Sequence, residues 1–333
     1  MRRRAAVSTQ TPIMIWLILT LSCILLWGFT DILLKKSLDH TACLSQYKMF
    51  VWIGLVAAAT AVVMAFCSDT LSDSIRLVTG NLRFLIPIDL IYVTAMFFGL
   101  LGAKHLDASV VSPLENIDGA FTAIALYFFF AFTGRSSVTD SVGTVDLLGT
   151  VAILMGVVLL GIQEQKLSGG EAGLAEEKKK HRLGALALLF PIAYNLADAA
   201  SMVVTGIVVS GETEISIPDI DYIFFECLAF AVTAVLVWLY MLIGKHYRYN
   251  PFRRTELTRC GAAACETAGT MAFTFAVAIS PILTAPITSS YCLVTIVLAR
   301  IFLKERLTGK QYLSLAFVIA GIALLGVSEI LNV

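Results

Sequence analysis

The chain has 333 residues, of which 58% are hydrophobic and only 14% are charged. Its mean hydropathy is +0.84. The charged fraction is low, because about a quarter of the residues of a soluble domain are charged. The formal net charge is zero, so the basic surface typical of nucleic-acid binding is not indicated and no nucleic-acid partner is expected. Seven cysteines are scattered, mostly in apolar runs, without the spacing of a zinc site or a disulfide framework. We therefore expect no metal and no cofactor.

The chain contains ten apolar runs that are long enough to cross a membrane as helices. A helix rises 1.5 Å per residue, so about 20 residues span the ~30 Å hydrocarbon layer of a bilayer. After an N-terminal tail at 1–12, the predicted helices cover residues 13–34, 45–67, 83–104, 107–132, 145–163, 183–209, 221–244, 256–279, 282–303 and 310–330. The predicted fold class is an all-α integral membrane protein with ten transmembrane helices in contact with membrane lipids.

A polar linker at 164–182 divides the chain into two five-helix halves, 13–163 and 183–330. Its mixed charges and its Ser-Gly-Gly sequence are typical of a solvated linker. Three short patterns recur in the two halves: Trp27 to Asp31 with Tyr194 to Asp198, Pro113 with Pro286, and Gly156 to Gly161 with Gly321 to Gly326. Because five is an odd number of spans, the second half must enter the membrane with the opposite polarity. The sequence therefore predicts two inverted repeats, an architecture of secondary transporters with the substrate site at the repeat interface.

The second half also carries a family resemblance. Ser280-Pro281, Pro286, the charged hinge at 304–308 (Lys-Glu-Arg-Leu-Thr), Gly321 and Gly326 together resemble the EamA-type repeat of the drug/metabolite transporter superfamily. The Leu-Leu-Trp27-Gly28 sequence is similar to the opening helix of that family. The resemblance implies a secondary active transporter that moves a small metabolite or drug-like solute by alternating access. It leaves the substrate open, because the superfamily handles amino acids, nucleotide sugars, amines and drugs.

Acidic residues inside the predicted spans are the main candidates for function. An aspartate at the centre of a membrane helix costs about 2.5–3.5 kcal/mol on insertion scales. Glu115 and Asp118 lie three residues apart on one predicted helix, and Thr122 continues their face. Asp198 and Glu266 lie in mid-span. Helix–helix hydrogen bonding is the alternative role for these four.

Three other acids have a simpler interpretation in the sequence. Asp31 lies four residues before Lys35, so a local ion pair is an equal alternative to a site role. Asp89 and Glu226 fall in the first turns of their predicted helices, where a carboxylate favours the positive end of the helix dipole.

Aromatic side chains accompany these acids. Trp27 and Tyr194 each precede an aspartate by four residues, and Tyr291 lies in the polar start of the run 282–303. Because a cation is attracted to a ring face, acids and rings together favour a cationic or zwitterionic small-molecule substrate. Interface anchoring is the alternative for any one ring. The predicted substrate- and proton-binding residues are Asp198, Glu266, Glu115, Asp118, Asp31, Trp27, Tyr194, Asn195 and Tyr291.

One of the mid-membrane acids is expected to carry a coupling proton, because burial penalises the charged form of a carboxyl group. Asp198 is the first choice, with Asp31 supplying a neighbouring like charge. No HExxH, GxSxG or P-loop motif occurs, so we expect no catalytic residues and no enzyme. Two alternatives remain: a cation channel, and an intramembrane aspartyl enzyme, which requires two carboxyl groups close together.

The remaining expectations concern location and assembly. We expect a multi-pass protein of the plasma or inner membrane, either a monomer or a homodimer. The resemblance and the Arg2–Arg4 cluster favour cytoplasmic termini. Most other Lys and Arg residues lie in loops on the opposite side, and by the positive-inside rule those loops face the cytoplasm. Both orientations stay open.

Overall fold

A computed structural model of the chain describes residues 2–38, 44–67, 71–105, 115–135, 139, 142–171, 189–213, 216–303 and 309–331. Within these ranges the regular secondary structure is helical and contains no strand. The helices are α1 (Arg2–Ser37), α2 (Ser45–Cys67), α3 (Leu71–His105), α5 (Asp118–Phe132), α7 (Thr144–Glu171), α8 (Leu189–Val209), α9 (Asp219–Leu239), η3 (Tyr240–Gly244), η4 (Arg254–Glu256), α10 (Leu257–Ile279), α11 (Pro281–Thr288), α12 (Tyr291–Leu303) and α13 (Gly309–Leu331).

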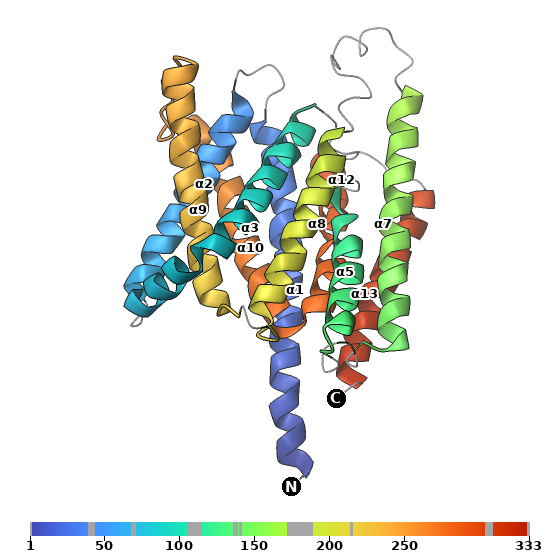
Figure 1. Ribbon diagram of the computed structural model, residues 1–333. Helices are drawn as coiled ribbons and strands as arrows, with labels where there is room; N and C mark the ends of the chain where they lie inside the picture. Colours follow the sequence, from blue (N-terminus) through green and yellow to red (C-terminus); the bar gives the residue numbers. More distant parts are fainter. Residues whose placement is uncertain are drawn as a thin grey trace.

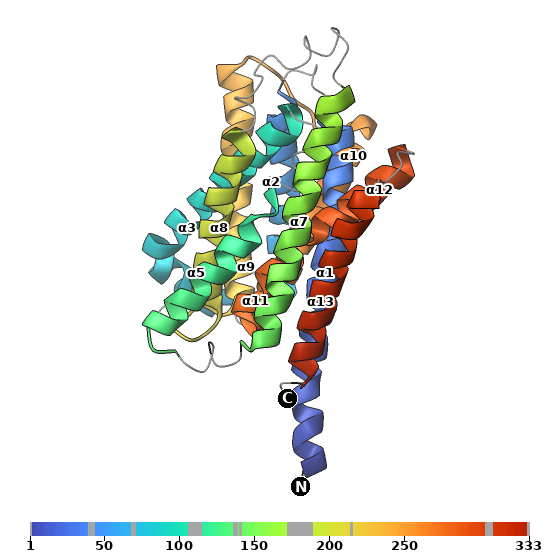
Figure 2. The ribbon, with the colours of Figure 1, turned by 90° about the vertical axis from the view of Figure 1, so that its right-hand side faces the viewer.

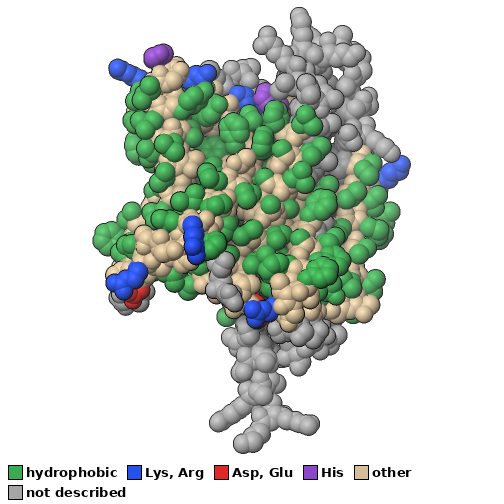
Figure 3. All heavy atoms as spheres, in the orientation of Figure 1, with side chains coloured by type: hydrophobic (Ala, Val, Ile, Leu, Met, Phe, Trp, Pro, Cys, Tyr) green, Lys and Arg blue, Asp and Glu red, His purple; other side chains and the backbone are tan. Residues whose placement is uncertain are grey.

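Seven helices in the described part of the chain are long and apolar enough to cross a membrane. They are Met14–Ser37, Ser45–Cys67, Leu71–His105, Leu189–Val209, Asp219–Gly244, Arg254–Ile279 and Pro281–Leu298. Three shorter apolar helices cover Phe121–Phe132, Thr144–Gly156 and Tyr312–Gly321. Figure 3 shows hydrophobic side chains over most of one face, with Lys and Arg mainly toward its two ends. These are the features of an all-α, multi-pass membrane protein.

The helices run roughly parallel to one axis, and both chain termini lie at the same end of the bundle (Figures 1 and 2). We call this the terminal end. The C-terminal ends of α1 and α3 lie at the opposite end (Figure 1). The first turns of α1 project beyond the bundle at the terminal end (Figure 2).

Four helix pairs form the frame of the bundle. α1 packs along α10, α3 along α8, α2 along α9, and α7 along α13. The last pair is close because of glycine: a Cβ atom on Gly321 would lie 2.6 Å from the carbonyl oxygen of Gly149 and 2.9 Å from the nitrogen of Ile153. Small residues at such a crossing let the two backbones approach within van der Waals contact in lipid.

Three predicted boundaries need correction. α1 begins at Arg2, so the predicted tail 1–12 is helical from that residue on, and α7 extends to Glu171, into the predicted linker 164–182. Polar Gln, Glu and Lys are good helix formers and continue a helix where hydropathy ends. α3 begins at Leu71 rather than at 83, because Val78 is buried against Val208 and Ile217 and extends the helix packing. The rest of the linker and the hinge at 304–308 lie outside the described residues.

The predicted helix 282–303 is interrupted, because the turn residues Ser289 and Ser290 separate α11 from α12 within the span Pro281–Leu298. The hydroxyl of Ser289 donates to the Ala285 carbonyl at 2.9 Å, and that of Ser290 donates to the Ile287 carbonyl at 2.6 Å. Serine side chains that bond nearby carbonyls compete with the helical ladder. The predicted helix 107–132 also differs, since α5 begins at Asp118 after a turn at 116–117. Residues 106–114, including Pro113, lie outside the described residues.

Candidate functional site

A central cavity lies between α1, α3, α5, α8, α9, α10 and α12. The space between its lining atoms is about 1070 Å³, counting the part that opens to solvent. Its lining reaches Lys35 in the last turn of α1 and Ala103 in the last turn of α3. The cavity therefore extends toward the end of the bundle opposite the termini.

Carboxylates dominate the polar lining of the central cavity. The acidic residues in this lining are Asp31, Glu115, Asp118, Asp198, Glu226 and Glu266. Lys35 is the one basic residue among the described lining residues, and its side chain is exposed. Carboxylates at this density repel anions and attract cations or protons.

Eight of the nine predicted site residues line this cavity: Trp27, Asp31, Glu115, Asp118, Tyr194, Asp198, Glu266 and Tyr291. The exception is Asn195, which is buried and follows the lining residue Tyr194 in the sequence. Its side-chain amide donates to the backbone carbonyl of Glu115 at 3.5 Å. Asn195 therefore positions the segment before α5. Glu115 and Asp118 meet at the cavity without sharing a helix face, because the chain turns between them at 116–117.

Asp118 and Asp198 face the same cavity from two helices in contact, α5 and α8. Asp118 lies in the first turn of α5 and accepts the amide of Gly119 at 2.6 Å, and Asp198 accepts the hydroxyl of Tyr194 at 3.2 Å. Asp31, the partner predicted for Asp198, also lines the cavity and accepts the hydroxyl of Thr295 at 2.8 Å on the α12 side.

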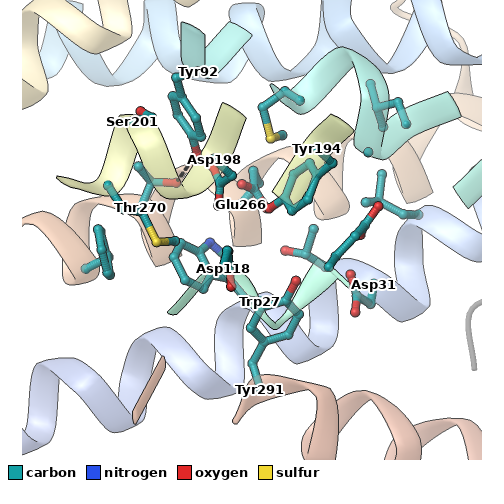
Figure 4. A pocket seen from close by; sticks show the side chains of 18 of the residues that line it. Trp27, Asp31, Tyr92, Asp118, Tyr194, Asp198, Ser201, Glu266, Thr270 and Tyr291 are labelled. Carbon is teal, nitrogen blue, oxygen red and sulfur yellow. Dashed lines mark hydrogen bonds between the residues drawn. The ribbon is translucent and has the colours of Figure 1, made fainter. Parts of the chain in front are cut away.

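Trp27 forms an aromatic corner of the cavity (Figure 4). Its ring centroid lies 5.5 Å from that of Phe273 and 5.6 Å from that of Tyr291, the latter edge-on. The indole fits here because α10 carries glycine opposite it: a Cβ atom on Gly269 would lie 2.6 Å from the Trp27 Cδ1 atom. The Trp27 Nε1 atom is buried without a hydrogen-bond partner among the described residues. The corner thus presents ring surface and a donor beside Asp31 and Glu266.

Several cavity residues were not among the predicted site residues. Tyr92 on α3 contacts Thr270 on α10 through a 3.3 Å hydroxyl pair. Thr205 and Tyr222 form another hydroxyl pair, at 2.7 Å. Single hydroxyl residues in apolar runs carry little signal in one sequence, because packing alone decides which of them face a cavity.

Two acids were placed wrongly at helix starts by the sequence analysis. Glu226 lies in the third turn of α9, lines the cavity and is buried. Asp89 lies in the middle of α3, two residues after Pro87, and only 4% of its surface is exposed. Neither of its carboxylate oxygens has a hydrogen-bond partner among the described residues. Both acids are interior because α3 and α9 pack against each other and against α8 and α2.

The terminal end of the cavity is closed by packing. The Trp16 indole donates to the Thr284 hydroxyl at 2.8 Å, which joins α1 to α11. An apolar cluster around this bond includes Leu126 and Phe130 of α5 and Ile287 of α11, all fully buried. These residues lie on the terminal side of Trp27 and Asp118 along their helices, so the cavity is open at one end and blocked at the other.

No metal site is indicated among the described residues, where no group of three or more His, Cys, Asp or Glu side chains is placed to hold an ion. 

Comparison with known proteins identifies the fold and not the family. No family model matches the sequence, and no curated protein matches it. The structure matches 26 chains of solved structures. One of them, a crystal structure of a protein, has a TM-score of 0.64 and 14% sequence identity, covering 92% of this chain and 94% of its own. At this identity the similarity shows a shared full-length fold alone.

Proposed function

We propose that this chain is a secondary active transporter that moves a small cationic or zwitterionic solute across a membrane by alternating access. The observation that carries the proposal is the central cavity, which is open at one end, blocked at the other and lined by six carboxylates with one exposed lysine. A carrier needs a mid-membrane site that opens to one side at a time. Ring faces at Trp27 and Tyr291 complement the carboxylates for binding a cation.

Helix pairing supports the proposed inverted repeats. If the first five helices correspond to the last five, the α1–α10 contact corresponds to the α8–α3 contact, and α5–α8 corresponds to α12–α1; all four contacts occur. The pairs α2–α9 and α7–α13 each join corresponding helices. This is the pattern expected when two similar halves pack around a two-fold axis.

The starts of two helices support the same proposal. Asp118 and Tyr291 each lie five residues after the aligned prolines Pro113 and Pro286, and each begins a helix after a turn. Both residues line the cavity. An interrupted helix such as the α11–α12 pair is typical of transporter binding sites. Together with the sequence resemblance, this favours an EamA-type, ten-helix carrier.

The test is counterflow in liposomes that contain the purified chain. Vesicles preloaded with an unlabelled amine substrate should accumulate the labelled substrate transiently and saturably, because a carrier exchanges solutes one for one. A cation channel would give no counterflow overshoot and would show single-channel currents instead. The absence of a counterflow overshoot, or the presence of single-channel currents in its place, would overturn the carrier proposal.

An intramembrane aspartyl enzyme is a second candidate, since Asp118 and Asp198 line the same cavity. A carrier is favoured because four further carboxylates line the same cavity, and a two-aspartate hydrolysis does not need them. Incubating the purified protein with labelled transmembrane peptides separates the two. Cleavage that is lost in both Asp118→Asn and Asp198→Asn would establish the enzyme.

A further inference from the structure

A second, smaller pocket lies beside the central cavity, between α2, α3, α9 and α10. It holds about 340 Å³ of space. Its outer part is apolar and is formed by Ile53, Ala57, Ile223, Cys227, Phe230 and Met271. We call it the lateral pocket.

The central cavity and the lateral pocket share a wall. The shared lining residues are Tyr92, Met96, Glu226, Glu266 and Thr270. The ring of Tyr92 stands edge-on to that of Phe230, with 5.3 Å between centroids, and its hydroxyl contacts Thr270. The wall is therefore one layer of side chains from α3, α9 and α10, and it contains two carboxylates.

The two carboxylates place negative charge at the inner end of an apolar space. Both side chains belong to the shared wall, and Glu226 is buried with 7% of its surface exposed. A carboxylate held in an apolar interior favours a positively charged group beside it. The apolar walls beyond it favour a hydrocarbon or aromatic group.

We propose that the substrate is an amphipathic amine, whose ammonium group binds between Glu226 and Glu266 and whose apolar arm fills the lateral pocket. This inference rests on the proposed function and narrows its substrate class. A compact zwitterion would fill the central cavity alone, whereas an alkyl or aryl amine would use both spaces. Ala57 and Met271 then set the length of the arm that the protein accepts.

The experiment measures binding of methylammonium, propylammonium and hexylammonium to the full chain in lipid nanodiscs by titration calorimetry. In the unmodified protein, affinity should rise about fourfold for each methylene that the pocket buries. Ala57→Phe fills the pocket from α2 and should reduce hexylammonium affinity by about tenfold or more while leaving methylammonium binding unchanged. Ala59→Phe is the matched control, since Ala59 is exposed on the same helix. Empty nanodiscs measure the partitioning of each amine into lipid.

Met271→Ala enlarges the lateral pocket and provides a second test if Ala57→Phe does not fold. In this variant, affinity should keep rising with amine chain length beyond the length at which it levels off in the unmodified protein. An equal chain-length dependence in Ala57→Phe and Ala59→Phe, or an unchanged limit in Met271→Ala, would overturn the lateral pocket as a substrate site. The proposal of a cationic substrate would be overturned by a different result, namely that none of the amines, including methylammonium, binds the unmodified protein.

Discussion

Among single residues, Asp198 is buried in the cavity wall, where it accepts the hydroxyl of Tyr194 at 3.2 Å. Asp198→Asn keeps an oxygen that accepts the Tyr194 hydrogen bond and removes the group that can take up and release a proton. We expect at least a tenfold loss of transport driven by a pH gradient, while substrate exchange and folding are retained. Uptake into liposomes with and without a pH gradient measures both.

Asp219→Asn is the control for this prediction. Asp219 lies in the first turn of α9, away from the cavity lining, and binds the amide of Ile220. Its replacement should leave the pH dependence of transport unchanged. If Asp198→Asn also transports with an unchanged pH dependence, the Asp198 carboxyl group is structural and the coupled proton, if there is one, binds elsewhere.

The position of the Trp27 ring depends on a residue that has no side chain. A Cβ atom on Gly269 would lie 2.6 Å from Trp27 Cδ1 and 2.7 Å from Nε1, so Gly269→Ala must displace the indole from the aromatic corner. We expect amine affinity to fall by about fivefold to thirtyfold, since a cation–π contact contributes roughly 1–2 kcal/mol when desolvated.

Gly261→Ala is the matched control on the same helix, because its Cβ atom would meet only Leu33 Cδ1, at an ordinary 3.5 Å. Titration of both variants with the same amine makes the comparison. Equal affinities in the two variants would show that the Trp27 ring packs against neighbouring side chains and does not contact the substrate.

Among whole elements, the α7–α13 pair shows how helices of this chain approach each other without a hydrophobic driving force. Gly321→Ala would place a methyl group 2.6 Å from a backbone oxygen of α7, where no side chain can rotate away. The two helices must separate, and we expect a loss of roughly 1–3 kcal/mol of stability, as for other overpacked cores. Thermal unfolding in detergent measures it.

Gly309→Ala is the corresponding control on α13, because nothing lies within 4 Å of its Cβ position. Its melting temperature should match that of the unmodified protein or exceed it slightly, since alanine is the better helix former. If the Gly321→Ala and Gly309→Ala proteins had the same melting temperature, α7 and α13 would pack less closely than the structure shows.

For the whole molecule, alternating access makes a prediction about when the cavity can be reached. Cysteines introduced at 31 and 198, in a background without the native cysteines, should react with a small polar thiol reagent from one membrane face at a time. In the described state the open side is the end opposite the termini, because Trp16 and Thr284 join α1 to α11 at the terminal end. Substrate should change the reaction rates at both positions together.

The control for accessibility is a protein that keeps Cys67 as its one cysteine, since Cys67 is exposed and does not line the cavity. Its labelling should not respond to substrate. Cysteines at 31 and 198 that stay unreactive from both faces, or that react equally from both faces at once, would contradict a cavity that alternates.

The class of the protein could be predicted from the sequence, and so could a set of residues that mostly line one cavity. Hydropathy is a local property, so runs of apolar residues identify a multi-pass helical membrane protein without knowledge of any contact. Acids inside such runs are costly and rare, which is why eight of nine predicted site residues line one cavity. Neither step depends on which helix packs against which.

The contacts between those residues were decided by the tertiary structure. Asp118 and Asp198 face one cavity because α5, which begins after the turn at 116–117, packs against α8. The burial of Glu226 and the lateral pocket beside it depend on how four helices pack. The side chains that face one another in a bundle depend on the rotation of each helix about its own axis, which a single sequence does not contain.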